Sequence, residues 1–389
     1  MNRIDELIAV VPEAPEYVIN WSMIKRTVMR PFVESLKNTK QSPKYHAEGD
    51  VWVHTEMVCE SLAASNTFRS LSEKQQQELF LAALFHDIGK ASTTRFEDGD
   101  WHSPRHAEVG ANFVREMLWR EYGVCGEPDL QNFRETICFL VRYHMTPPYM
   151  LEAKDSEKRI IRTASAGELA PDFSIKLLTA LSVADSSGRL CKEDSMGTEK
   201  HELCAQLAEE LACFDVPPVF SSPFTEYAYL SGKNVTPDTE LYNDCACRAV
   251  MICGLPGTGK DTFIKERYFD YKMISLDDIR SEFGIPPIGS QSEVIRIAKS
   301  RMTEMLRKKR DFVFNATNIT PDIRSKMISL WMSYKAYVRV VFLETSWNEN
   351  LRRNIGRDDC VPRYVIEKML SKLIPPERFE AHEVDWICV

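Results

Sequence analysis

Residues 249–262 read AVMICGLPGTGKDT and decide the fold of the C-terminal part of the chain. The apolar run AVMIC leads into a glycine-rich turn with the spacing G-x4-G-K, which ends at Lys260. Glycines in such a turn let successive backbone N–H groups point into one concavity that holds phosphates, and the lysine adds a positive charge for the β- and γ-phosphates. The stretch therefore predicts a nucleotide-binding loop between a strand and a helix.

The apolar pattern on either side of this loop divides the chain into two domains. After it, YKMIS (271–275), DFVFN (311–315) and YVRVVFL (337–343) are typical of strands, and 290–309, 321–334 and 362–374 of helices. This alternation predicts an α/β domain over 248–389, with a parallel sheet covered by helices on both faces. Before it, helical spacing from about Val51 to Leu211 predicts an all-α domain within 1–213. The Pro- and Ser-rich segment 214–247 is the expected linker or boundary.

Composition excludes several classes of protein. With 389 residues, 44% hydrophobic and 27% charged, the chain fits a folded, water-soluble protein of more than one domain. No apolar run approaches the roughly 20 residues that cross a bilayer. The acidic N-terminus and the eleven cysteines without framework spacing favour a cytoplasmic protein with reduced thiols. Residues 248–389 carry 24 Lys and Arg against 19 Asp and Glu, so this half is the better candidate to attract phosphates.

Five metal-capable elements are spread along the predicted helices. They are His54, His86-Asp87, His106, His144 and Asp185, separated by 32, 20, 38 and 41 residues. Each gap is long enough for one helix to lead away from a common centre and a second helix to return to it. The His-Asp pair ends the apolar run FLAALFHDIGK, where burial is costly unless a cation satisfies both groups. A mixed N/O set favours Mn, Fe, Co, Ni or Zn, which would polarise a phosphoryl oxygen. A lone histidine is more often structural, so the hypothesis depends on the whole set.

At these residues the sequence resembles the HD phosphohydrolase superfamily, through His54, HDIGK at 86–90, HAEVGA at 106–111, His144 and ADSSGR at 184–189. The resemblance implies one or two divalent transition metal ions such as Mn, Co, Ni or Zn. The implied core is His54, His86, Asp87 and Asp185, and the implied second-ion ligands are His106 and His144. Lys90, assisted by Arg189, would contact substrate phosphate. The remaining histidines match no element and are expected to be structural or surface residues: His46, His102, His201 and His382.

The glycine-rich loop departs from the usual pattern at one position. Candidate contacts to ATP and Mg²⁺ are Gly254, Gly257, Thr258, Gly259, Lys260, Asp261 and Thr262. Asp261 stands where a Ser or Thr usually follows the lysine, so either Asp261 or Thr262 could contact Mg²⁺. No clear Walker B acid ends the next strands, and DFVFN stops at Asn315.

Two further motifs indicate a phosphoryl acceptor and a closing segment. In LDDIR (276–280), Asp277 follows a predicted strand and could accept a proton from a hydroxyl, while Arg280 could clamp a phosphate. In LRRNIGRDDCVP (351–362), Arg353 and Arg357 are four apart, which predicts one helical face that closes over ATP. The alternative for LDDIR is a helix-capping Asp followed by an exposed Arg.

These residues resemble the 5′-polynucleotide kinase family, with ATN at 316–318, Arg324 and VPRYVIEKMLSKLIPP at 361–376 as further matches. The resemblance implies Asp277 as general base, Arg280 as ligand of the acceptor's 3′-phosphate, and Arg353 and Arg357 on the donor phosphates.

The two resemblances together point to the bacterial bifunctional HD-domain phosphohydrolase–polynucleotide kinases. They imply an RNA end-healing enzyme that hydrolyses 2′,3′-cyclic phosphate or 2′-phosphate ends and phosphorylates 5′-hydroxyl ends of RNA or DNA from a nucleoside triphosphate. A separate RNA ligase is implied, since no nucleotidyl-transfer lysine motif is found, and no membrane association is expected. Two alternatives remain: an HD-type nucleotidase fused to a small-molecule kinase, and an HD sensor module that regulates an ATPase. The residues alone support a metal-dependent hydrolase fused to a transferase that uses a nucleoside triphosphate.

Overall fold

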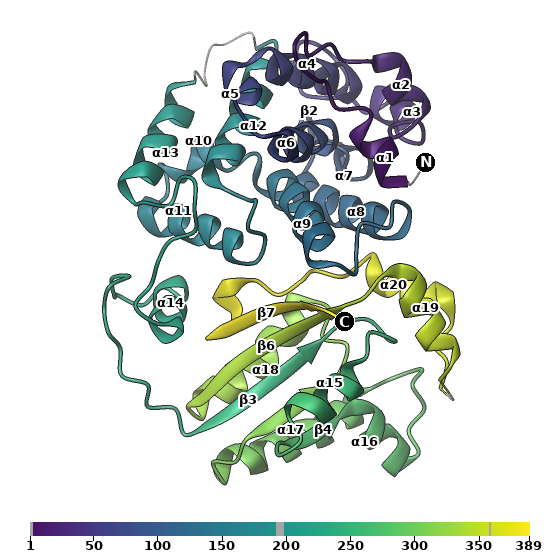
Figure 1. Ribbon diagram of the computed structural model, residues 1–389, viewed down its shortest axis with the longest axis vertical. Coiled ribbons are helices and arrows are strands. Elements are labelled where there is room, and N and C mark those ends of the chain that lie inside the picture. The colour runs from purple at the N-terminus through teal and green to yellow at the C-terminus, as the bar shows by residue number, and fades with distance from the viewer. Residues whose placement is uncertain (1–2, 192–197, 358) are drawn as a thin grey trace. The chain divides into compact units, whose positions relative to one another are not determined.

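A computed structural model describes residues 3–191, 198–357 and 359–389 (Figure 1). The chain divides into two compact units, Met1–Val124 with Asp129–Pro218, and Cys125–Pro128 with Val219–Val389. We call them the helical unit and the sheet unit. The prediction of a helical domain followed by an α/β domain with a parallel sheet is confirmed.

The helical unit consists almost entirely of helices. They are α1 (Arg3–Ile8), α2 (Trp21–Arg26), α3 (Val33–Lys37), α4 (Val51–Ala64), α5 (Asn66–Arg69), α6 (Glu73–Phe85), α7 (Lys90–Thr93), α8 (His106–Arg120), α9 (Pro128–Tyr143), α10 (Pro147–Met150), α11 (Ser156–Ala164), the 3₁₀ turn η1 (Ser165–Glu168), α12 (Ile175–Ser187) and α13 (Glu199–Glu210). The helical unit also contains a short antiparallel hairpin of β1 (Arg95–Glu97) and β2 (Asp100–His102). The sequence pattern did not predict this hairpin.

Helices α4, α6 and α12 pack against one another at the centre of this unit. Each begins at a residue whose side chain accepts a backbone hydrogen bond, which satisfies an N–H group that the helix leaves unpaired: Asp50, Ser72 and Ser174. Every residue from Leu79 to Phe85 in α6 is buried, so this end of the helix has no solvent-facing side. The helix ends at Phe85 and His86 caps it, which places the His-Asp pair in the interior.

The sheet unit is built on five parallel strands in the order β4-β5-β3-β6-β7. The strands are β3 (Cys247–Cys253), β4 (Lys272–Ser275), β5 (Phe312–Asn315), β6 (Ala336–Glu344) and β7 (Glu383–Cys388). The helices are α14 (Pro223–Leu230), α15 (Lys260–Arg267), α16 (Leu276–Phe283), α17 (Ser292–Arg307), α18 (Pro321–Ser333), α19 (Trp347–Ile355) and α20 (Arg363–Leu370), with the 3₁₀ turn η2 (Arg378–Glu380). The edge strand β7 is one that the apolar pattern did not predict.

Alternate side chains of β5 contact helices on opposite sides of the sheet, so helices cover both of its faces. Val313 belongs to a buried cluster with Ile264 of α15. Phe312 and Phe314, on the opposite face, contact the ring of Trp331 in α18 at centroid distances of 5.2 and 6.1 Å. The central strand β3 is where the strand order reverses, which is where open α/β sheets bind their ligands.

The segment 214–247 contains α14, and this helix packs against η2 within the sheet unit. Phe224 stacks on His382 with ring centroids 5.1 Å apart, and Tyr227 contacts the same ring at 4.7 Å. All eleven cysteines are free thiols. None of the helices in the described ranges has the length and apolar character needed to cross a bilayer.

Candidate active sites

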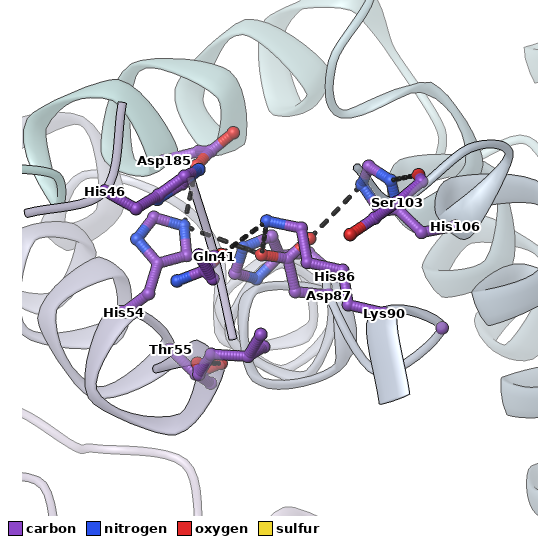
Figure 2. A network of polar contacts seen from close by, with 12 residues as sticks. Gln41, His46, His54, Thr55, His86, Asp87, Lys90, Ser103, His106 and Asp185 are labelled. Carbon is purple, nitrogen blue, oxygen red and sulfur yellow. Dashed lines mark hydrogen bonds and ion pairs between the residues drawn. The ribbon is translucent and has the colours of Figure 1, made fainter. Parts of the chain in front are cut away.

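The six residues proposed as metal ligands lie together inside the helical unit, and none is more than 6% exposed. They come from five different helices or helix ends: His54 of α4, His86 and Asp87 after α6, His106 at the start of α8, His144 after α9, and Asp185 of α12. Asp87 lies among them (Figure 2). Its carboxylate is 3.3 to 3.9 Å from the Nε2 atoms of His86, His106, His54 and His144. Asp185 Oδ1 is 3.0 Å from His54 Nε2.

Three of the four histidines are oriented in the same way. Each places Nδ1 at 2.7 or 2.8 Å from the backbone carbonyl of the residue three positions earlier: His86 on Ala83, His106 on Ser103 and His144 on Val141. A carbonyl only accepts a hydrogen bond, so Nδ1 carries the proton and Nε2 keeps its lone pair. The three lone pairs are thereby directed toward Asp87, which is how metal-ligating histidines are held.

The unpaired polar atoms of this cluster, and the protonation states of His144 and Asp87, fit a divalent cation. His86 Nε2, His106 Nε2 and both carboxylate oxygens of Asp87 are buried without a hydrogen-bond partner, a cost that a bound cation would remove. Burial and the nearby His86 lower the pKa of His144 to about 3, so this imidazole is neutral near pH 7. Burial raises the pKa of Asp87, but Lys90 and His86 outweigh it and hold that pKa well below its ordinary value. Neutral imidazoles and ionised carboxylates are the forms that bind transition metals.

Two basic side chains lie beside the acids of the cluster. Lys90 Nζ is 2.7 Å from Asp87 Oδ2 and donates to Gln41 Oε1 at 2.8 Å. Arg189 Nη2 is 2.7 Å from Asp185 Oδ2. Lys90 and Arg189 thus each pair with one carboxylate of the cluster.

Motif reasoning missed three residues here. His46, which the sequence assigns to a structural or surface role, lies 4.8 Å from the His54 ring between centroids, and its Nδ1 is 2.7 Å from Glu48 Oε1. Burial raises the pKa of Glu48, but hydrogen bonds from His46 and His54 outweigh it and leave that pKa below its ordinary value. Gln41, His46 and Glu48 lie in an irregular segment before α4, so neither helical period nor motif spacing marks them.

The glycine-rich loop of the sheet unit connects β3 to α15, and its shape requires glycine. Gly257 has φ +87°, and a Cβ there would stand 2.6 Å from the carbonyl oxygen of Asn350 in α19. Lys260 Nζ donates to the carbonyls of Gly254 at 3.1 Å and Leu255 at 2.7 Å. Burial lowers the pKa of Lys260 to about 8.

Asp261 and Thr262, the alternative contacts for Mg²⁺, lie differently. Asp261 Oδ1 accepts a hydrogen bond of 2.6 Å from Asn315 Nδ2, at the carboxyl end of β5. Asn315 Oδ1 is buried without a hydrogen-bond partner. Thr262 follows Asp261 on α15, and both residues are exposed. Asp261 and Asn315 therefore offer oxygen atoms of the kind that Mg²⁺ prefers, on two side chains that contact each other.

Asp277 and Arg280 lie on one turn of α16, directly after β4, and form an ion pair with each other. The Asp277 side chain is 72% exposed, and Arg280 Nη1 donates to Gln291 Oε1 at 3.1 Å. The charge of Asp277 raises the pKa of Lys260, against the larger effect of burial, so the acid lies near the nucleotide loop. The Asp277 carboxylate is thus open to solvent near the glycine-rich loop.

The prediction that Arg353 and Arg357 share one helical face is wrong. Arg353 lies in α19, but this helix ends at Ile355 and is capped at Gly356, so Arg357 lies beyond it. Both side chains still lie near the loop. Arg353 Nη1 is 3.3 Å from the position that a Cβ on Gly259 would take, and the charge of Arg357 contributes to the lowered pKa of Lys260.

Arg324, a match to the kinase resemblance, has a structural environment. It is fully buried, ion-paired with Glu380 at 2.7 Å, and donates to the carbonyls of Asn318 and Ile374. These contacts tie α18 to the segment before β7.

The chain thus combines two sites. The helical unit carries a cluster of histidines and aspartates of the kind that binds metal ions, and the sheet unit carries a nucleotide-binding loop. Residues 50–167 match the HD domain family, and residues 250–376 match the family described as AAA domain. The chain therefore contains an HD domain followed by a P-loop, kinase-like domain.

Individual relatives match only parts of the chain. The multifunctional CCA protein of Hahella chejuensis (strain KCTC 2396) is 29% identical over 160 residues, 41% of this chain and 34% of that protein. The L-seryl-tRNA(Sec) kinase of Methanococcus maripaludis is 28% identical over 137 residues, 33% of this chain and 52% of that protein. The chain thus spans about a third and about half of these curated relatives. A gluconokinase structure from Sinorhizobium meliloti 1021 has 20% identity and a TM-score of 0.27 over 36% of this chain and 82% of that one.

Proposed function

We propose that this protein heals RNA ends with two separate active sites. The HD site hydrolyses a 2′,3′-cyclic phosphate or 2′-phosphate end with one or two divalent transition metal ions. The P-loop site phosphorylates a 5′-hydroxyl end of RNA or DNA from ATP with Mg²⁺. RNA cut by its own 2′-hydroxyl leaves both of these ends, and the two products are the substrates of a separate ligase.

The observation that carries the hydrolytic half is the shared orientation of three histidines toward Asp87. His54, His86, His106, His144, Asp87 and Asp185 would hold the metal, which supplies Lewis acidity and an activated water when bound. Lys90 and Arg189 would bind the phosphate oxygens and neutralise their charge. Lys90 already contacts Asp87 and Arg189 already contacts Asp185, so on binding a phosphate each would replace a carboxylate partner with a phosphate oxygen.

In the kinase half, Lys260 would bind the β- and γ-phosphates and Asp277 would accept the proton of the 5′-hydroxyl. Arg280 would hold the phosphate on the 3′ side of the acceptor nucleotide, which a small hydroxyl substrate lacks. Arg353 and Arg357 would neutralise charge on the transferred phosphoryl group. The exposure of Asp277 supports a polymeric acceptor, because a chain end can reach it from solvent.

End-group analysis tests the proposal directly. A labelled RNA with a 5′-hydroxyl and a 2′,3′-cyclic phosphate is incubated with the full chain, ATP, Mg²⁺ and, in parallel, Mn²⁺, Co²⁺, Ni²⁺ or Zn²⁺. The expected product has a 5′-phosphate and an opened or removed cyclic phosphate, and a mononucleotide in excess does not compete. Competition by the mononucleotide would indicate a nucleotidase, and no metal-dependent hydrolysis would favour a sensor module.

A further inference from the structure

His54 differs from the other three histidines of the HD site in what its Nδ1 meets. Its Nδ1 lies 3.1 Å from Glu48 Oε1 and 3.3 Å from the Gly188 carbonyl, instead of on a carbonyl three residues earlier. Its Nε2 lies 3.0 Å from Asp185 Oδ1 and 3.7 Å from Asp87 Oδ2. A neutral imidazole has one proton, so a cation bound at Nε2 requires that proton on Nδ1. Nδ1 must then donate to Glu48, to Gly188, or to both.

Glu48 is held firmly in the place that this role requires. Its side chain is 1% exposed. Oε1 accepts from His46 Nδ1 at 2.7 Å as well as facing His54, and Oε2 accepts from the Leu190 N–H at 2.9 Å. The backbone N–H of Ala47 donates to the Leu190 carbonyl at 2.8 Å, so the segment is tied to the residues after α12, the helix that carries Asp185.

We propose that Glu48 is a positioning residue of the HD metal centre. It keeps the proton of His54 on Nδ1, fixes the plane of the ring and makes Nε2 a stronger ligand, while His46 holds the shared oxygen in place (Figure 2 shows His46 beside His54). The inference rests on the proposed role of His54 as a metal ligand. Carboxylate–histidine–metal arrangements of this kind typically contribute about 10- to 100-fold to metal affinity.

The same atoms allow one other interpretation, which the proton count disfavours. His46, Glu48 and His54 each offer a ligand atom within 4.8 Å of the others, as a further cation site would. A cation there would take Nδ1 of His54 while the HD metal takes Nε2. The ring would then have to lose both protons, which a neutral ligand does not require. Orientation by Glu48 needs no such loss.

Mn²⁺ binding to the full chain, measured by isothermal titration calorimetry without RNA or ATP, tests the proposal. Glu48→Gln keeps the shape of the side chain but lacks the charge, and Glu48→Ala removes the acceptor. The matched control is Glu60→Gln, a carboxylate on α4, the helix that carries His54, which accepts from Trp21 Nε1 at 2.6 Å. We expect unchanged stoichiometry, affinity weakened about 10-fold by Gln and up to about 100-fold by Ala, and no change in the control.

Equal Mn²⁺ affinity in wild type and both Glu48 variants would overturn the proposal. So would the loss of one bound ion with the others unaffected, since Glu48 would then be a ligand. A wild-type chain that binds no Mn²⁺, Co²⁺, Ni²⁺ or Zn²⁺ would remove the metal centre and the hydrolytic function with it, which is a different failure. Nitrogen-15 NMR of the Zn²⁺-loaded wild type, labelled at histidine, is independent of how the variants fold. It should show His54 protonated on Nδ1, and metal on Nδ1 would contradict the proposal.

Discussion

Lys260 should take up a proton when the protein binds ATP. In the free protein its Nζ donates to the Gly254 and Leu255 carbonyls, and burial lowers its pKa to about 8. Phosphate oxygens favour the charged amine, so the pKa rises in the complex. At pH 8 about half of the free molecules carry an uncharged Lys260, so binding takes up about 0.5 proton, against about 0.1 at pH 7. ATP affinity should therefore fall about tenfold from pH 7 to pH 9.

Calorimetry at pH 8 in two buffers of different ionisation enthalpy measures this proton uptake. Lys260→Met should bring the uptake close to zero. Arg357→Ala should reduce it, because removal of a neighbouring positive charge raises the pKa of Lys260 in the free protein. Uptake near zero in the wild type, or an unchanged value in Lys260→Met, would refute the reasoning.

Three further predictions concern single residues of the two sites. Asp87→Ala should abolish hydrolysis of RNA ends and spare phosphorylation, and Lys260→Ala should do the reverse; loss of both activities in one folded variant contradicts the independence of the sites. Gly257→Ala should weaken binding of a fluorescent ATP analogue by about tenfold or more, because its Cβ would stand 2.6 Å from the Asn350 carbonyl at φ +87°, and unchanged affinity argues against this close approach. Arg280→Ala should lower kcat/KM for a 3′-phosphorylated acceptor about 100-fold and leave ATP binding intact, as a competition titration with ATP shows.

The sequence allowed a prediction of which residues meet in the HD site because their burial is so costly. A buried His-Asp pair at the end of the apolar helical run 79–85 needs polar or metal partners. Other metal-capable residues follow at intervals that allow the predicted helices to bring them back to this pair. The structure brings His54, His106, His144 and Asp185 to this pair. Their role as ligands remains a prediction.

Other parts of the site depend on irregular backbone, which has no period to detect. His46 and Glu48 reach the cluster because residues 46–48 bond to the segment after α12, a long-range contact that no local pattern marks. The expected helical face of Arg353 and Arg357 fails for a local reason, since Gly356 ends α19 between them. Glycine is common just after the last residue of a helix, so Gly356 in the sequence predicts this break.

Strand β7 escaped prediction because it is an edge strand. Within the described part of the chain it pairs with β6 alone, and Val384 is its one buried residue. Its polar residues bond across to β6, Glu383 to Tyr337 and Asp385 to Arg339. Alternation of polar and apolar residues over so few positions is a weak signal beside the continuous apolar run of β3.

Anomalous diffraction from crystals of the full chain grown with Mn²⁺ tests the central claim most directly. We expect a manganese peak bounded by His54, His86, Asp87 and Asp185, with His106 and His144 beside any second peak. A crystal that shows Asp185 turned away from His86 with no anomalous peak between them would contradict it.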